Sequence, residues 1–309
     1  MSRLIADKFK EWEAECEARF NQLKANEEEL NRIFIDIYGL QDELTPEVED
    51  KDVTVRKADL QREIKSLISY AIGCILGRYS HYTEGLLYAG GDWEDAIERL
   101  EGIRQEAIGS SDEIFVPDED NILPICDDDY FEDDLAGKIF KWVEVVYGKE
   151  TLEENLRFIA DALGGKGTSR EVIRNYLLNG FYTDHLKIYQ KRPIYWLFSS
   201  GKKNGFKALI YMHRYQPDLL ARMRTDYVHE QQERYRTQLT MLEESVDSAA
   251  PSEKVKLNKQ IAKLKDQALE IQIFEEKLHH LADMMISIDL DNGVKVNYEK
   301  FAEILEKIK

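Results

Sequence analysis

The chain has 309 residues, 43% of them hydrophobic and 10% aromatic, which is enough to fold around a sizeable core. Its formal net charge of −18 excludes a protein that coats nucleic acid uniformly, but it is compatible with a local basic face. The three scattered cysteines form no C-x-x-C pair, which argues against a zinc module or a disulfide framework and favours a cytoplasmic location. No apolar run reaches the roughly 18 residues that a membrane helix needs, so we expect no membrane partner.

Residues 1–40 are predicted to form a long N-terminal helix, over residues 3–31, and a connector. Phe9, Trp12, Cys16 and Phe20 recur at spacings of three and four, as on one face of a helix, and the opposite face is charged. Residues 31–40 are apolar enough that we expect them to be buried.

Residues 41–165 are predicted to form an acidic helical domain. We expect helices over 59–76, 135–147 and 152–163, and an acidic loop over 109–134. From Asp112 to Asp161 there are 16 acidic and 4 basic residues. The adjacent aspartates at 127–129 lack the alternate spacing and central glycine of a calcium loop, so we expect no metal ligands.

Residues 166–217 are predicted to form a basic helix-turn-helix and β-hairpin region. The stretch from Lys166 to Arg236 has 14 basic and 6 acidic residues. GGKGTS at 164–169 does not fit a phosphate loop, because a helix precedes it and its lysine lies between glycines. Instead, Thr168 and Glu171 form a capping box that begins a second helix over 170–179.

This corner has the outline of a DNA-reading unit. Arg170, Arg174 and Asn175 are expected at the exposed start of the second helix, and arginine and asparagine read guanine and adenine edges. A purely structural corner is the alternative, since most such corners bind nothing.

A β-hairpin is predicted from strands at 193–198 and 206–211, with Lys202 and Lys203 at its tip. Basic and aromatic residues alternate here, so lysines could contact phosphates while the aromatic rings stack on bases or fill the core. The candidate DNA-binding residues are Lys166, Arg170, Arg174, Asn175, Lys187, Lys191, Arg192, Lys202, Lys203, Lys207 and Arg214.

The last two predicted segments are an antiparallel coiled-coil hairpin over 218–286 and, over 287–309, a β-hairpin with a short helix. The first is indicated by apolar residues that repeat at coiled-coil spacing, and the second by the Asn292-Gly293 turn signal. The expected fold class is therefore mainly α with a small β element, a multi-helix domain plus an antiparallel coiled-coil hairpin.

The sequence holds no glycine-rich cofactor loop, no Asn-Pro-Pro-Tyr-like tetrapeptide and no cluster with metal-ligand spacing. We therefore expect no catalytic, cofactor-binding or metal-binding residues in this chain.

Long phrases of the sequence resemble the C-terminal half of PglX-type proteins, adenine-specific DNA methyltransferases of bacterial BREX phage-exclusion systems. Examples are ETLEENLRFIADALGGKGTSREVIRNYL and YQKRPIYWLFSSGKKNGFKALIYMHRY, and the resemblance extends from about Glu28 to Tyr298. It implies a target-recognition or DNA-docking region of an N6-adenine methyltransferase. The catalytic domain and its S-adenosylmethionine site would lie outside this chain.

The resemblance implies double-stranded DNA, the methyltransferase domain or other phage-defence proteins as partners. The alternative is a protein-interaction or regulatory module without DNA contact, acting through the acidic stretch 112–161 and the predicted helix pair. An autonomous enzyme would need a site that the sequence does not show.

Overall fold

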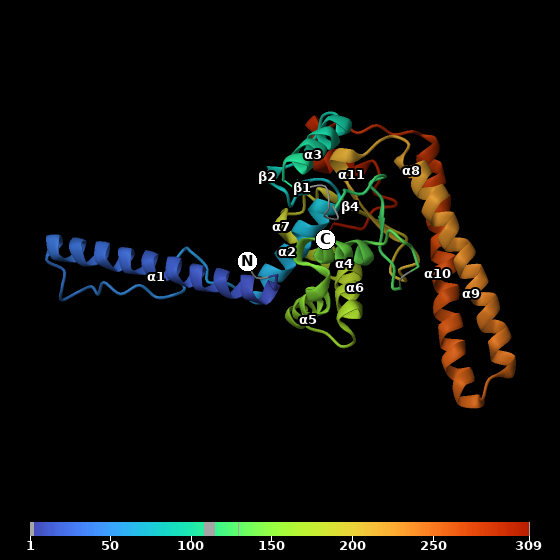
Figure 1. The fold of residues 1–309 in the computed structure, drawn as a ribbon, viewed down its shortest axis with the longest axis horizontal. Coiled ribbons are helices and arrows are strands. Elements are labelled where there is room, and N and C mark those ends of the chain that lie inside the picture. Colours follow the sequence, from blue (N-terminus) through green and yellow to red (C-terminus); the bar gives the residue numbers. More distant parts are fainter. Residues whose placement is uncertain (1–2, 108–114, 129, 309) are drawn as a thin grey trace.

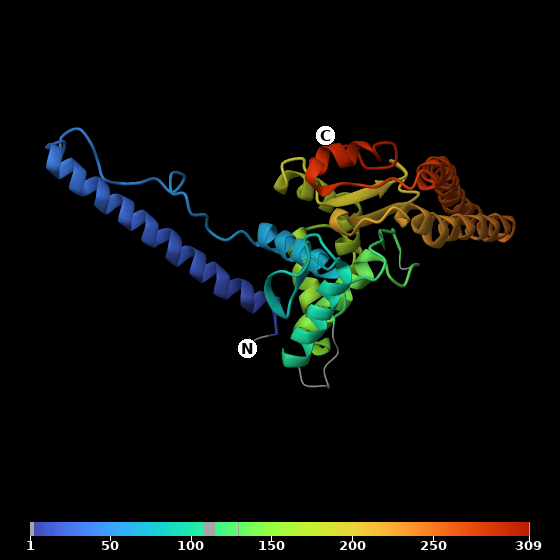
Figure 2. The ribbon, with the colours of Figure 1, turned by 90° about the horizontal axis from the view of Figure 1, so that it is seen from above.

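The computed structural model describes residues 3–107, 115–128 and 130–308. Two long helical projections extend from a central body on opposite sides (Figures 1 and 2). The described residues are mainly helical with small antiparallel sheets, which confirms the expected fold class at that level. None of the helices in these ranges is both long and apolar enough to span a membrane.

The first projection is α1 (Ile5–Tyr38), which continues past the predicted end near residue 31. The polar segment after it returns along the helix (Figure 2), held by the ion pair between Lys24 and Asp50 at 2.7 Å. The prediction that residues 31–40 are buried is wrong, because Phe34 is 55% exposed and Ile37 is 69% exposed. The helix carries this segment away from the body before it ends at Gly39, whose φ of 66° stops it.

The body contains the helices that the sequence predicts, with small differences at their ends. They are α2 (Leu60–Ile75), α4 (Leu135–Tyr147), α5 (Leu152–Leu163) and α6 (Ser169–Asn179). The body also contains α3 (Trp93–Ala107) and α7 (Phe181–Ile188). The capping box is confirmed, since the Thr168 side chain accepts from the Glu171 N–H while the Glu171 carboxylate accepts from the Thr168 N–H. A two-stranded sheet of β1 (Tyr79–Ser80) and β2 (Thr83–Leu86) follows α2.

The predicted β-hairpin is confirmed as β4 (Tyr195–Ser199) and β5 (Lys207–Tyr211), paired antiparallel. A third strand that the sequence did not indicate, β3 (Leu123–Pro124), pairs with the other edge of β5. It comes from the acidic segment expected to be a loop, and its two residues are too short to give a strand pattern.

The three-stranded sheet separates two hydrophobic cores. Alternate side chains of a strand point to opposite faces, so Leu197 and Leu209 join the core of α2, α4, α5 and α6. Trp196 and Ile210 join a second core with the C-terminal helices. Both faces of the sheet are therefore covered.

The second projection is a helical hairpin. It follows α8 (Leu219–Arg222) and a π-helical turn (Met223–Val228), and it consists of α9 (His229–Ser248) and α10 (Pro251–Asp283). The two helices lie side by side and antiparallel (Figure 1). That they supercoil as a coiled coil stays a prediction.

The predicted C-terminal β-hairpin is wrong. A 3₁₀ turn (Leu290–Asn292) leads into α11 (Gly293–Glu299). Asn292 has a φ of −70°, so it does not adopt the left-handed conformation that a primed hairpin turn requires. The buried Asn297 amide holds the turn instead, by accepting from the Asp289 N–H and donating to the Asp289 and Gly293 carbonyls.

We predict that two isoleucine truncations affect the free energy of unfolding to very different extents. Ile210→Ala should lower the free energy of unfolding by about 2–5 kcal/mol, because it leaves a cavity at a fully buried position in the second core. Ile37→Ala should change it by less than about 0.5 kcal/mol, since that side chain is 69% exposed. Urea titrations of both variants check this, and a comparable loss in Ile37→Ala would contradict the exposed position of the α1 end.

Candidate nucleic-acid interface

The structure divides the predicted DNA-binding residues among the α5–α6 corner, the α7 helix and its end, the β4–β5 turn and the buried interior. The α7 end contacts the β1 region through Tyr189 and Arg78, whereas the β4–β5 turn contacts α10. The basic stretch is thus distributed over several elements rather than gathered on one helix.

Two of the predicted residues are structural. Arg174 was expected at the surface but is buried, where it pairs with Asp134 and donates to the Cys126 and Asp128 carbonyls. The reason is that the face of α6 that carries Arg174 is turned toward the acidic segment. Arg214 is also buried, donating at 2.8 Å to the Asp118 carbonyl.

Both arginines hold the acidic segment through its backbone carbonyls, and Arg174 also holds it through the Asp134 carboxylate. The Arg214 guanidinium also lies 3.6 Å from the ring centroid of Trp93, and burial lowers its pKa to about 10. The Arg174–Asp134 pair lies in the interior, where burial raises the pKa of the carboxyl group. Neither side chain is available to read a base edge.

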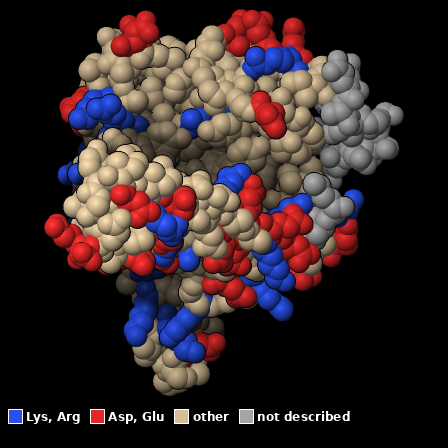
Figure 3. Space-filling view, turned by 90° about the vertical axis from the view of Figure 1, so that its left-hand side faces the viewer, with Lys and Arg blue, Asp and Glu red and all other residues tan. Residues whose placement is uncertain are grey.

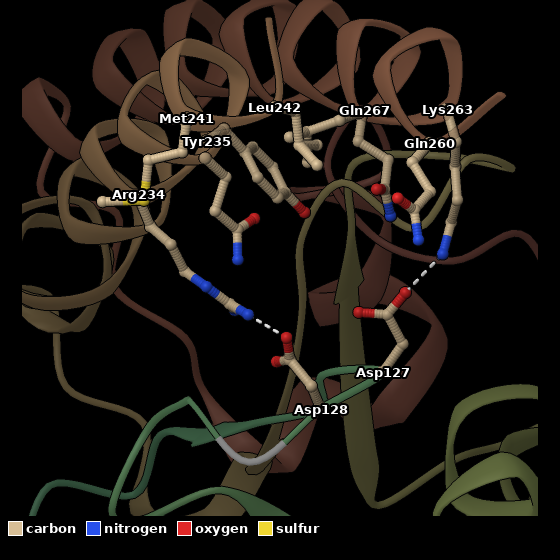
Figure 4. Close-up of a pocket in the computed structure, with 11 residues that line it drawn as sticks. Asp127, Asp128, Arg234, Tyr235, Met241, Leu242, Gln260, Lys263 and Gln267 are labelled. Atoms are coloured by element: carbon tan, nitrogen blue, oxygen red, sulfur yellow. Dashed lines mark hydrogen bonds and ion pairs between the residues drawn. The ribbon is translucent and has the colours of Figure 1, made fainter. Parts of the chain in front are cut away.

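The acidic segment is further neutralised by the helical hairpin (Figure 4). Asp128 pairs with Arg234 of α9, and Asp127 pairs with Lys263 of α10 at 2.6 Å. These ion pairs face a pocket of about 410 Å³ between the hairpin and the segment. Acidic and basic groups that lie far apart in the sequence are therefore paired in the fold, and the Asp127 and Lys263 side chains stay 43% and 63% exposed.

The α5–α6 corner presents less free charge than predicted. Arg170 pairs with Glu153 at 2.5 Å and lies over the Phe140 ring. Asn175 is exposed and its side chain accepts from the Asn179 amide. Lys166 is exposed in the turn.

A larger pocket of about 620 Å³ lies where α6, α7, the β4–β5 hairpin and the C-terminal segment meet. Its lining includes Asn179, Thr183, Lys202 and Lys207. Lys207 donates to the Leu178 carbonyl at 2.9 Å, and burial lowers its pKa. The pocket therefore joins two predicted basic residues to polar side chains that the sequence interpretation did not include.

The exposed face of α7 extends this polar surface. Lys187 lies one helical turn after Thr183 and is 73% exposed, in a weak ion pair with Asp184 at 3.5 Å. The spacing of Thr183 and Lys187 by four residues is a signal that the sequence did contain.

The chain turns sharply after α7. Gln190 and Lys191 adopt φ values of 50° and 61°, a left-handed conformation that costs a non-glycine residue about 1–3 kcal/mol. The turn is closed by the Lys191 N–H, which donates to the Leu186 carbonyl at 2.8 Å. It exposes Lys191 and Arg192, and within the described chain neither has a carboxylate at ion-pairing distance. Strained turns of this kind often occur at functional sites.

The β4–β5 turn is held against α10 by Glu270. This carboxylate accepts from the Lys203 and Gly205 N–H groups and from the Ser200 hydroxyl. A Cβ at Gly205 would lie 2.6 Å from the Gln267 carbonyl, so the close approach requires glycine. Lys203 pairs with Asp266 at 2.6 Å, so Lys202 is the exposed lysine of the turn that has no carboxylate at ion-pairing distance among the described residues.

Within residues 3–107, 115–128 and 130–308, no group of three or more His, Cys, Asp or Glu side chains could hold a metal ion. Burial raises the pKa of the free Cys74 thiol to about 11, so this cysteine is protonated near neutral pH.

The chain is similar over nearly its whole length to part of the adenine-specific methyltransferases. It is 49% identical over 94% of its length to adenine-specific methyltransferase PglX of Lacticaseibacillus casei (strain Zhang). It is 39% identical over 94% of its length to adenine-specific methyltransferase BrxX of Escherichia coli O9:H4 (strain HS). These matches confirm the resemblance noted in the sequence. The chain spans about a quarter of the length of these curated relatives, and no family model matches it.

We predict that Arg174→Met lowers the free energy of unfolding by about 3 kcal/mol, because it leaves Asp134 buried without its partner. Arg170→Met should cost less than about 1 kcal/mol, since its ion pair is partly exposed. Urea denaturation measures both. Equal losses in the two variants would contradict the structural role of Arg174.

Proposed function

We propose that this chain is the DNA-docking region of an adenine-specific DNA methyltransferase of a phage-defence system, with the catalytic domain and S-adenosylmethionine supplied by another part of the enzyme. The observation that carries the proposal is a run of exposed basic groups: Lys187 on α7, Lys191 and Arg192 in the strained turn, and Lys202 at the pocket rim. Lysine and arginine side chains of this kind contact the phosphates of duplex DNA. The similarity of the chain to adenine-specific methyltransferases supports DNA as the substrate.

The proposed interface differs from the one that the sequence suggested. Arg174 and Arg214 hold the fold and do not take part. Arg170 and Lys203 are paired with carboxylates, so their attraction for phosphate is weakened. We therefore place docking at the α7 turn and the rim of the pocket rather than at the α5–α6 corner.

A second function, docking of another protein, is favoured by the exposed apolar end of α1. Leu30, Ile33, Phe34, Ile37 and Tyr38 are between 44% and 69% exposed. An apolar surface of this kind marks a protein contact more often than a nucleic-acid contact. This surface lies on the α1 projection, so both functions are compatible with one chain (Figure 1).

We predict that the triple variant Lys187→Glu, Lys191→Glu, Lys202→Glu binds a labelled duplex at least about tenfold more weakly than the wild type. Its plot of log affinity against log salt should also be shallower by about two to three, because roughly one unit of slope is lost with each phosphate contact. Fluorescence anisotropy across a salt series measures both quantities.

The matched control reverses Lys10, Lys256 and Lys259, which are exposed on the two projections. It makes the same change in net charge but should leave affinity within about twofold of the wild type. Equal loss in the two triple variants would mean that net charge alone is responsible, and it would overturn the proposed interface.

A further inference from the structure

Arg78 is a half-buried cation at the base of the β1–β2 hairpin. Its guanidinium donates to the Tyr189 hydroxyl at the end of α7. It also lies over two rings, 4.9 Å from the centroid of Tyr79 and 5.6 Å from that of Tyr189. Arg78 therefore contacts the end of α7, next to the strained turn that carries Lys191 and Arg192.

No carboxylate of the described residues lies within ion-pairing distance of Arg78. The other withdrawn arginines differ: Arg174 pairs with Asp134, and Arg214 donates to three backbone carbonyls. A charge taken partly out of water without a counter-ion is costly, so its position favours an anionic ligand.

Aromatic rings surround this cation. His185 stacks on Tyr195 with centroids 4.9 Å apart, and Tyr211 lies 4.8 Å from His213. Burial, with the nearby charge of Arg78, lowers the pKa of His185 to about 3 and lowers the pKa of His213. Both histidines are neutral near pH 7, so Arg78 carries the positive charge of the cluster.

A pocket of about 410 Å³ adjoins the cluster and shares Tyr79 with it. Its lining includes three tyrosines, Tyr70, Tyr79 and Tyr82, together with His81 and Glu84. Figure 3 shows that the left-hand side of the molecule in Figure 1 is hollowed, with basic side chains in the hollow and at its edge. Tyr70 and Tyr79 already stack on each other with ring centroids 5.4 Å apart, and a base can add to this group of rings. Glu84 can accept a hydrogen bond from an amino group.

We propose that Arg78 and the tyrosine-lined pocket bind a nucleotide, with the guanidinium on its phosphate and its base on the tyrosine rings. Arginine donates two parallel hydrogen bonds to a phosphate, and aromatic side chains stack on any base. The nucleotide is either free or an unpaired unit of a nucleic acid. The inference goes beyond duplex docking, because a base within a paired duplex cannot reach such a pocket.

The test with free ligand is calorimetry of the whole chain with adenosine 5′-monophosphate and with adenosine. We expect the monophosphate to bind at least about tenfold more tightly than the nucleoside, and Arg78→Gln to abolish that difference. The matched control, Arg56→Gln, removes an exposed arginine and should bind like the wild type. Arg78→Lys keeps the positive charge but not the paired N–H donors of the guanidinium, so its preference for the monophosphate should be intermediate. Thermal melts check that each variant is folded.

The test with nucleic acid compares a fully paired duplex with the same duplex carrying one unpaired adenosine. Tighter binding of the second duplex, lost in Arg78→Gln, identifies the nucleic acid as the source. Monophosphate binding without this preference identifies a free nucleotide. The proposal is overturned if neither the monophosphate nor the unpaired adenosine is preferred. Arg78→Gln should leave affinity for the paired duplex unchanged. Failure of the nucleotide proposal can therefore be told apart from failure of duplex docking.

Discussion

The arrangement of the molecule depends on a small sheet that is buried on both faces. Its alternating side chains supply both cores, Leu197 and Leu209 on one side and Trp196 and Ile210 on the other. Both edges of β5 are paired, one with β4 and the other with β3. Because β3 belongs to the acidic segment, closing the sheet also brings that segment into the interior, next to the basic part of the chain.

The position of the acidic segment decides which charged side chains remain available to bind partners. Arg174, Arg214, Arg234 and Lys263 are engaged with the acidic segment, through its carboxylates, its backbone carbonyls or both. The chain keeps its overall acidity, but among the described residues Lys191, Arg192 and Lys202 remain exposed around α7 and the β4–β5 turn with no carboxylate at ion-pairing distance. A protein with a net charge of −18 can thereby present a surface suited to phosphates.

Local patterns predicted most of the helices, the capping box at Thr168 and the β4–β5 hairpin, because periodicity and turn chemistry act within a few residues. Tertiary contacts decided the rest. The apolar end of α1 could not be recognised as exposed, since burial depends on what a helix lies against. The Asn292-Gly293 signal was overridden by the Asn297 side chain. In the candidate site, composition identified the basic stretch. It could not show that Arg174 pairs with Asp134, or that Arg78 has no carboxylate at ion-pairing distance within the described part of the chain.

Hydrogen–deuterium exchange of the whole chain, with and without duplex DNA at low salt, tests the central claim most directly. We expect protection of backbone amides at residues 187–192 and 199–207, and no change in the outer half of α1 or along α10. Protection confined to the helical hairpin or the α5–α6 corner, or no protection at all, would contradict a docking surface at the α7 turn and the pocket rim.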